Sequence, residues 1–178
     1  MAEMESLMDL LEDELKDLYS AENQLTKALP RMAKKASSKM LKDAFTKHLK
    51  ETEGHVKRLE RIGKSLDIKL SGKVCQAMKG LIEEGKEILG EKGEPSILDA
   101  ALIGAAQRVE HYEMAGYGVV RTIAEHLDLT EVAQLLQQTL DEEKATDQKL
   151  TQIAEEEVYG EAAGIGAEED EEELEEEE

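Results

Sequence analysis

Apolar side chains recur every three or four residues along most of this chain, and this spacing constrains its fold more than any other feature. In the first such stretch the recurring residues are Leu7, Leu11, Leu15, Leu18, Leu25 and Leu29. Residues spaced in this way lie on one face of an α-helix, and that face must be buried against other helices. No segment alternates apolar and polar residues between turn residues, as a half-buried strand does. We therefore expect an all-α protein.

Turn residues divide the chain into five predicted helices. Pro30 is expected to kink or divide the first helix, Ser37-Ser38 to supply a turn and an N-cap for the second, and Ser96 to cap the fourth. The predicted helices span about residues 3–36, 39–66, 73–89, 97–127 and 131–159. Four of them are long and the third is short. This order predicts a four-helix bundle of two hairpins, joined by one long crossover that contains the short extra helix.

Charge divides the chain into two regions. Ten of the eleven residues 168–178 are acidic, so about half of the net charge of −20 lies there. A run of like charges repels itself and buries nothing. We therefore expect one bundle domain at 1–160, followed by a disordered acidic tail at 161–178. The rest of the chain is also acidic, which disfavours nucleic acid and anionic membrane surfaces as partners.

Features of the whole chain indicate a cytoplasmic protein. The single cysteine, Cys75, has no partner for an intrachain disulfide, as is common in a reducing compartment. The first residues carry acids and no apolar signal segment. No stretch approaches the roughly 20 apolar residues that a membrane-spanning helix requires.

An internal repeat relates the two predicted hairpins. A shift of 91 residues superimposes two pairs of acids and three pairs of apolar residues. The pairs are Glu22 with Glu113, Glu51 with Glu142, Leu49 with Leu140, Leu59 with Leu150, and Ile62 with Ile153. We therefore expect the hairpins to be related by approximate twofold symmetry.

Glutamates interrupt the apolar stripes of the first and fourth predicted helices. Glu22 lies in the stripe that includes Leu18 and Leu25, and Glu113 lies between Val109 and Tyr117, with Glu110 one turn earlier. An unpaired buried carboxylate costs several kcal/mol, so such groups are paired, protonated or bound to a metal. The alternative is that each glutamate lies at the edge of its stripe and reaches water. The two acids and their repeat partners together favour a buried metal site, because a divalent cation also removes their mutual repulsion. Hard oxygen ligands with an imidazole suit iron or manganese, and they also accept zinc.

The second and fifth predicted helices offer further ligands. The second contains His48-x-x-Glu51-x-x-x-His55. Here His55 is as compatible with a core or boundary position as with a ligand, and His48 fits a boundary position better than a ligand. The fifth helix contains Glu142 and Glu143, followed by Asp147. The repeat selects Glu142, whereas the apolar stripe passes closer to Glu143, and we retain both with Glu142 slightly preferred.

The sequence resembles a known family in five segments, which together cover most of residues 7–157. These segments are DLYSAENQLTKALPRMA, HLKETEGHVKRL, CQAMKGLIEEG, DAALIGAAQRVEHYEMAGYG and TLDEEKATDQKL. They are similar to the bacterial YciE/YciF family of ferritin-like proteins, and RVEHYE and EEKATD are the most specific matches. The resemblance implies a ferritin-like bundle, a homodimer and a link to stress responses.

The wider ferritin-like superfamily implies a di-iron or di-manganese site. Its ligands are one glutamate on each of two helices and Glu-x-x-His on each of the other two. Carried onto this chain, the single glutamates are Glu22 and Glu113. The Glu-x-x-His glutamates become Glu51 and Glu142, but Gly54 and Ala145 stand three residues later, and neither can bind a metal. The residues that can substitute are His55, Glu110, Glu143 and Asp147; otherwise the site is degenerate.

Two functions from different classes follow. The leading prediction is a carboxylate-bridged dinuclear protein that binds iron or manganese and reacts with dioxygen or peroxide, with ferroxidase-like or peroxide-consuming activity. The alternative is a non-enzymatic structural or interaction dimer that keeps the bundle and has lost metal chemistry. The missing histidines at the expected spacing favour the alternative.

Overall fold

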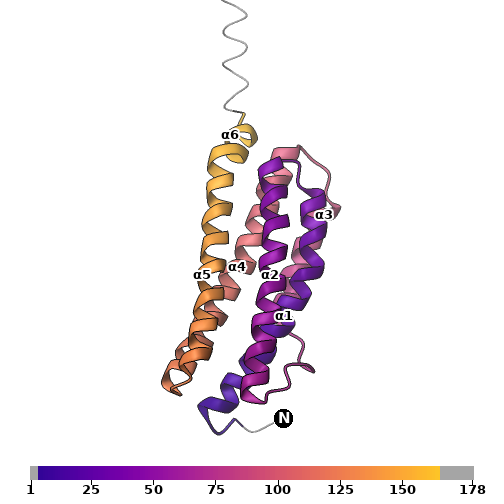
Figure 1. Ribbon diagram of the computed structural model, residues 1–178. Coiled ribbons are helices and arrows are strands. Elements are labelled where there is room, and N and C mark those ends of the chain that lie inside the picture. Colours follow the sequence, from indigo (N-terminus) through magenta and orange to yellow (C-terminus); the bar gives the residue numbers. More distant parts are fainter. Residues whose placement is uncertain (1–3, 165–178) are drawn as a thin grey trace, which may run out of the picture.

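The computed structural model describes residues 4–164, and its regular elements are all helical (Figure 1). The helices are α1 (Leu7–Lys35), α2 (Lys39–Leu66), α3 (Gln76–Gly90), α4 (Pro95–His126), α5 (Thr130–Ile153) and α6 (Tyr159–Ala162), and a π-helical turn, η1 (Ala154–Val158), joins the last two. The hairpins α1–α2 and α4–α5 form the four-helix bundle, and the crossover between them contains α3, which packs on α1 and α4. The predicted fold class is confirmed.

The two hairpin turns are fixed by polar groups. At the first, Ser38 caps α2 by accepting a hydrogen bond from the Leu41 amide at 3.0 Å. The buried Asp99 of α4 accepts from the amides of Ser37 and Ser38, which ties this turn to the other hairpin. At the second turn, Asp128 adopts a φ of 57°, a left-handed conformation that aspartate tolerates better than most residues.

Several predicted helix ends differ from the structure. Pro30 does not divide α1, which is continuous; Pro30 is exposed, so the hydrogen bond that it lacks lies on the solvent side. Ser96 does not cap α4, because Pro95 occupies the first helical position and Glu94 precedes it.

The C-terminal end also differs. The predicted single helix over 131–159 is interrupted by η1, where Glu157 accepts a hydrogen bond from Ser38 at 2.7 Å. Of the predicted acidic tail, 161–178, only the first four residues lie within the described residues, and two of them end α6. Residues 165–178 lie outside the described part of the chain.

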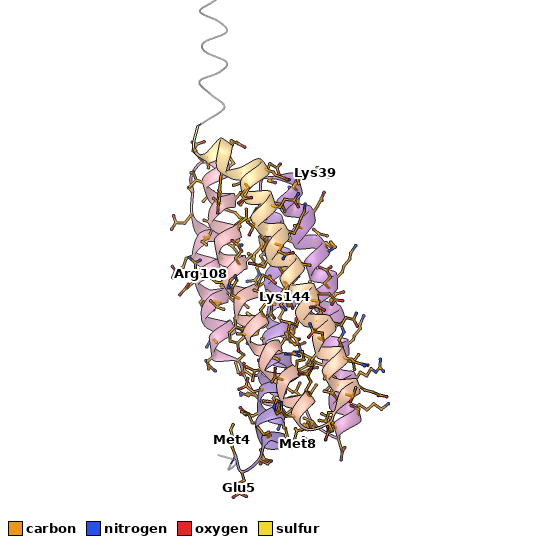
Figure 2. The ribbon with its side chains drawn as sticks, turned by 90° about the vertical axis from the view of Figure 1, so that its left-hand side faces the viewer. Met4, Glu5, Met8, Lys39, Arg108 and Lys144 are labelled. Carbon is orange, nitrogen blue, oxygen red and sulfur yellow. The ribbon has the colours of Figure 1, made fainter. Side chains whose placement is uncertain are left out.

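The outside of the bundle is polar. Charged side chains such as Arg108 and Lys144 project from it into solvent (Figure 2). Within residues 4–164, none of the helices is both long and apolar enough to cross a membrane.

The core consists of two apolar clusters at opposite ends of the bundle. One is built around Leu25, Leu29, Phe45, Leu102 and Ile153, and includes Cys75 and Met78 from the crossover. The other is built around Leu11, Leu15, Leu59, Val120 and Leu136. Each of the four long helices contributes to both clusters, so each must cross the boundary between them. That boundary is where the stripes predicted from sequence are interrupted by acids.

A close approach at the end of α2 provides a test of the packing. A Cβ on Gly63 would lie 3.0 Å from the Ile68 carbonyl oxygen and 2.9 Å from Leu70, whereas a Cβ on Gly54 of the same helix would meet nothing within 4 Å. We expect Gly63→Ala to lower the free energy of unfolding by about 1–2 kcal/mol, because a backbone oxygen cannot move aside cheaply. This corresponds to a midpoint about 2–8 °C lower in thermal melts. The control, Gly54→Ala, should leave the midpoint unchanged or raise it; equal effects of the two substitutions would contradict this packing.

Candidate metal centre

A layer of buried polar side chains separates the two apolar clusters. It contains four glutamates and two histidines, here called the Glu/His cluster, and none of the six is more than 3% exposed. The members are Glu22 of α1, His48 and His55 of α2, Glu110 and Glu113 of α4, and Glu143 of α5. Each of the four long helices therefore places at least one member in the layer.

His55 connects the cluster to the surface. Its Nδ1 lies 3.3 Å from Oε1 of Glu22 and 3.0 Å from Oε1 of Glu143. Its Nε2 lies 2.8 Å from Oε2 of Glu142, which is also bonded by Arg58 at 3.0 Å. Glu142 is about one third exposed and thus stands behind the imidazole, on the side away from the core. This carboxylate fixes the orientation of the ring and leaves Nδ1 directed inward.

His48 has a similar arrangement with the nitrogens exchanged. Its Nε2 faces the cluster, 3.2 Å from Oε1 of Glu110 and 4.0 Å from Oε2 of Glu143. Its Nδ1 lies 3.3 Å from the hydroxyl of Thr146 and 3.8 Å from Oε2 of the partly exposed Glu51. Each imidazole therefore directs one nitrogen into the layer and has polar groups behind the other.

The inward-facing atoms are close together but poorly satisfied. Within the described residues, both carboxylate oxygens of Glu113 and Glu143 lack a hydrogen-bond partner, as do one oxygen each of Glu22 and Glu110 and the inward nitrogens of both histidines. Among the described residues, Oε1 of Glu22 accepts from the hydroxyl of Tyr117 at 2.5 Å. The inward nitrogens of the histidines lie 3.0–3.3 Å from oxygens of Glu22, Glu110 and Glu143, and they can act as donors when the rings are protonated. Buried polar atoms are almost always hydrogen-bonded, so this many orphaned acceptors in one place need another explanation.

The donor atoms form two groups of metal-binding size that share one residue. In one group, atoms of Glu22, His55 and Glu143 all lie within 4.8 Å of one another. In the other, the same holds for atoms of His48, Glu110, Glu113 and Glu143. Glu143 belongs to both, which is the arrangement of a carboxylate that bridges two ions. The chemistry of the donor set, carboxylate oxygens with imidazole, fits iron or manganese.

Burial and mutual repulsion shift two acids of the cluster, Glu113 and Glu143, toward the neutral form. Burial, and then the neighbouring Glu22 and Glu143, raise the pKa of Glu113 well above its ordinary value. Burial also raises the pKa of Glu143, to about 8, although its contact with His55 opposes the shift. For His55 burial acts in the other direction, but Glu143 and Glu22 outweigh it and raise the pKa to about 10. The metal-free layer therefore retains protons that an ion would displace.

The structure places five of the eight predicted site residues in the layer and three outside it. Glu22, His55, Glu110, Glu113 and Glu143 lie in the layer. Of the two neighbouring acids on α5, the fully buried one is Glu143, whereas Glu142, which is slightly preferred from the sequence, is partly exposed and contacts the outer nitrogen of His55. Glu51 likewise lies outside the layer, behind His48. Asp147 is directed away from it, toward Gln107 at 3.2 Å and His111 at 3.4 Å.

His48 lies in the layer, although its sequence position fits a boundary better than a ligand. Helical spacing does indicate its burial, because His48, Thr52, His55 and Leu59 follow one another at intervals of three or four residues, and all four are buried.

The Glu-x-x-His pattern is divided between two helices, with one half on α2 and the other half on α5. Both halves lie one residue later than the positions predicted from Glu51 and Glu142. The buried pair on α2 is Thr52-x-x-His55, and its repeat mate on α5 is Glu143-x-x-Thr146. Each helix thus retains one half of the pattern and has a threonine in place of the other half. His48 and Glu110 restore the total to four glutamates and two histidines, and the Thr146 hydroxyl bonds to the ring of His48.

Comparison with known proteins places the chain among similar sequences and structures. Residues 6–163 match the family described as a domain of unknown function, DUF892. Protein YciF of Escherichia coli (strain K12) is 46% identical over 152 residues, which are 85% of this chain and 92% of YciF. These matches confirm the resemblance found in the five sequence segments.

Solved structures agree with the fold. The crystal structure of the E. coli stress protein YciF has a TM-score of 0.82 and covers 85% of this chain and 96% of that one. YcfI of Rhodopseudomonas palustris, for which a structural role has been proposed, is 42% identical, with a TM-score of 0.81 over 84% of this chain and 95% of that one.

The raised pKa values predict how the stability of metal-free protein depends on pH. A carboxyl group whose pKa is raised by folding loses its contribution to stability as pH rises from its unfolded value, about 4.5, toward its folded value. Glu113→Gln cannot ionise, so its thermal midpoint should exceed that of the wild type increasingly between pH 5 and pH 8, by about 5 °C or more at pH 8. The matched control is Glu53→Gln at an exposed position of α2. Circular-dichroism melts of chelator-treated protein check this, and a pH-independent difference for Glu113→Gln would contradict it.

Proposed function

The chain belongs to the family described as a domain of unknown function, DUF892, and on that premise we propose that it is a carboxylate-bridged dinuclear iron or manganese protein that reacts with dioxygen or peroxide. The observation that carries this proposal is the sharing of Glu143 between two groups of buried, unpartnered donor atoms. Four carboxylates and two imidazoles are the ligand total that di-iron carboxylate proteins place in a bundle core.

The ligands divide between two positions. Glu22 and His55 would hold one ion, and His48, Glu110 and Glu113 the other, with Glu143 between them. When bound, the two ions would supply the electrons and the Lewis acidity for reduction of dioxygen or peroxide. The pKa values of Glu113 and Glu143 are raised in the metal-free layer, so uptake of ions must release protons.

The surrounding residues position the ligands and control solvent. Arg58 holds Glu142, and Glu142 holds His55 by its outer nitrogen, so neither ring nor carboxylate is free to turn. Tyr117 donates to one oxygen of Glu22 and leaves the other for an ion. The apolar clusters on either side exclude bulk water along the bundle axis, which strengthens the electrostatic attraction of the layer for cations.

Metal content tests the proposal. Protein purified without chelators, or loaded anaerobically with Fe²⁺ or Mn²⁺, should contain about two ions per chain by elemental analysis. We expect Glu143→Gln to lose most of both ions, because it removes the charge common to the two positions. Asp147→Asn, a control acid one turn further along α5 and outside the layer, should retain both. Absence of metal from the loaded wild-type protein, or equal loading of Glu143→Gln, would contradict the proposal.

A second candidate function is a structural or interaction protein without metal chemistry, assembled as the homodimer predicted from sequence. It is favoured by the structural role proposed for the 42% identical YcfI, and by the two threonines, Thr52 and Thr146, at positions where the superfamily pattern has ligands.

Thermal melting separates the two functions. A ligand that binds only the folded state stabilises it by about 2.7 kcal/mol at a free concentration of 100 times its dissociation constant. For a chain of this size the dinuclear centre therefore predicts a midpoint about 5–10 °C higher with saturating Mn²⁺ than with chelator. The structural alternative predicts no metal-specific rise, with Mg²⁺ at the same concentration as the control.

A further inference from the structure

The surface between α2 and α5 is hollowed directly over one end of the Glu/His cluster. These helices lie side by side in the bundle (Figure 1). A cavity of about 40 Å³ lies between them, and its wall includes His48 and Glu110. This volume has room for a few water molecules. The inward Nε2 of His48 and one oxygen of Glu110, both buried, have no hydrogen-bond partner among the described residues.

A wider, open groove lies beside this cavity. Its lining comes from α2 and α5: Glu51, Gln134, Gln137, Gln138, Asp141, Glu142 and Ala145. Two of these residues, Glu51 and Ala145, also line the inner cavity. These two side chains therefore lie at the boundary between the groove and the cavity.

The charged side chains that line the outer groove are carboxylates, those of Glu51, Asp141 and Glu142. The inner cavity is lined by charges of both signs, since Lys47 and Lys149 also border it. Lys47 is three-quarters exposed where it pairs with Glu51, and the ammonium of Lys149 bonds to Gln152 on the next turn, so both ammonium groups are held by other partners. Carboxylates in a concave surface raise the local concentration of cations and speed their association.

Glu51 spans the junction between the two spaces. Its Oε1 lies 2.7 Å from the exposed ammonium of Lys47, and its Oε2 lies 3.8 Å from Nδ1 of His48. The side chain is one quarter exposed, so it contacts solvent and the buried layer at the same time. By contrast, a hollow between α1, α3 and α4 is lined by apolar residues such as Met32 and Leu81, and none of the Glu/His cluster borders it.

We propose that divalent cations reach the Glu/His cluster through this passage between α2 and α5, and that Glu51 transfers them from the outer groove to His48 and Glu110. The inference rests on the proposed function, since it assigns an access route to that metal centre. It assigns a role to Glu51 that differs from the ligand role predicted from sequence, and it places the exposed Ala145 at the boundary between the two spaces.

The rate of metal uptake tests the route separately from the existence of the site. Chelator-treated protein is mixed with Co²⁺, and the absorbance of the bound ion is followed in a stopped-flow instrument, with the final stoichiometry measured by titration. We expect Ala145→Phe to slow association at least tenfold, because a bulky side chain at the junction obstructs the passage, while the final stoichiometry stays that of the wild type. Ala115→Phe, at an exposed position of α4 away from the passage, is the matched control and should load at the wild-type rate.

A second pair of variants tests the charge of the groove. Asp141→Asn should slow association about threefold and weaken its dependence on ionic strength, whereas Glu131→Gln, an equal charge change at the start of α5, should do neither. If Ala145→Phe lowers the stoichiometry, Asp141→Asn alone decides the outcome. Wild-type rates in both passage variants, with normal stoichiometry, would overturn the route and leave the metal centre intact. A wild-type protein that binds no Co²⁺ would overturn the proposed function, and the route with it.

Discussion

The rest of the structure depends on the burial of four carboxylates in one layer across the middle of the bundle. Burying even one such group without a partner costs several kcal/mol, and like charges close together add to that cost. The chain contains two imidazoles in the layer and Tyr117 beside it, which satisfy only part of the demand. Two divalent cations held by these ligands would remove both the repulsion and the unpaired acceptors, and the proposal of a metal centre rests on this.

The fold maintains the layer by fixing its surroundings from both sides. The two apolar clusters pack the helices above and below it, so that each long helix crosses the layer at a set height. Polar contacts then fix rotation about each helix axis. Asp99 connects the first hairpin turn to α4, and the Arg58–Glu142–His55 chain connects α2 to α5. A site on such rigid elements keeps its donor atoms together without an ion. In that state the raised pKa values of Glu113 and Glu143 favour their protonated forms.

Much of the fold and part of the layer could be predicted from the sequence. Helical periodicity identified the bundle, and the interruption of two stripes identified Glu22 and Glu113. At α2 and α5 the repeat selected residues outside the layer, because it was identified from identical residues at a fixed offset. Glu51 and Glu142 are identical because both lie on the outside, one behind each histidine. The buried residues at the same offset are Thr52 and Glu143, and because they differ in type they do not appear as a match in the repeat. A one-residue change of register turns a side chain by about 100°, so a broad apolar stripe cannot decide between neighbouring acids.

The central claim, that Glu143 is shared between two ions, is tested most directly by anomalous diffraction from crystals of the iron- or manganese-loaded protein. A dinuclear centre predicts two peaks in the layer, about 3.5–4 Å apart, with Glu143 in contact with both ions and each histidine in contact with one. No peak in the layer, or ions bound only at Glu51, Asp141 and Glu142 on the surface, would contradict a dinuclear centre and favour the structural role.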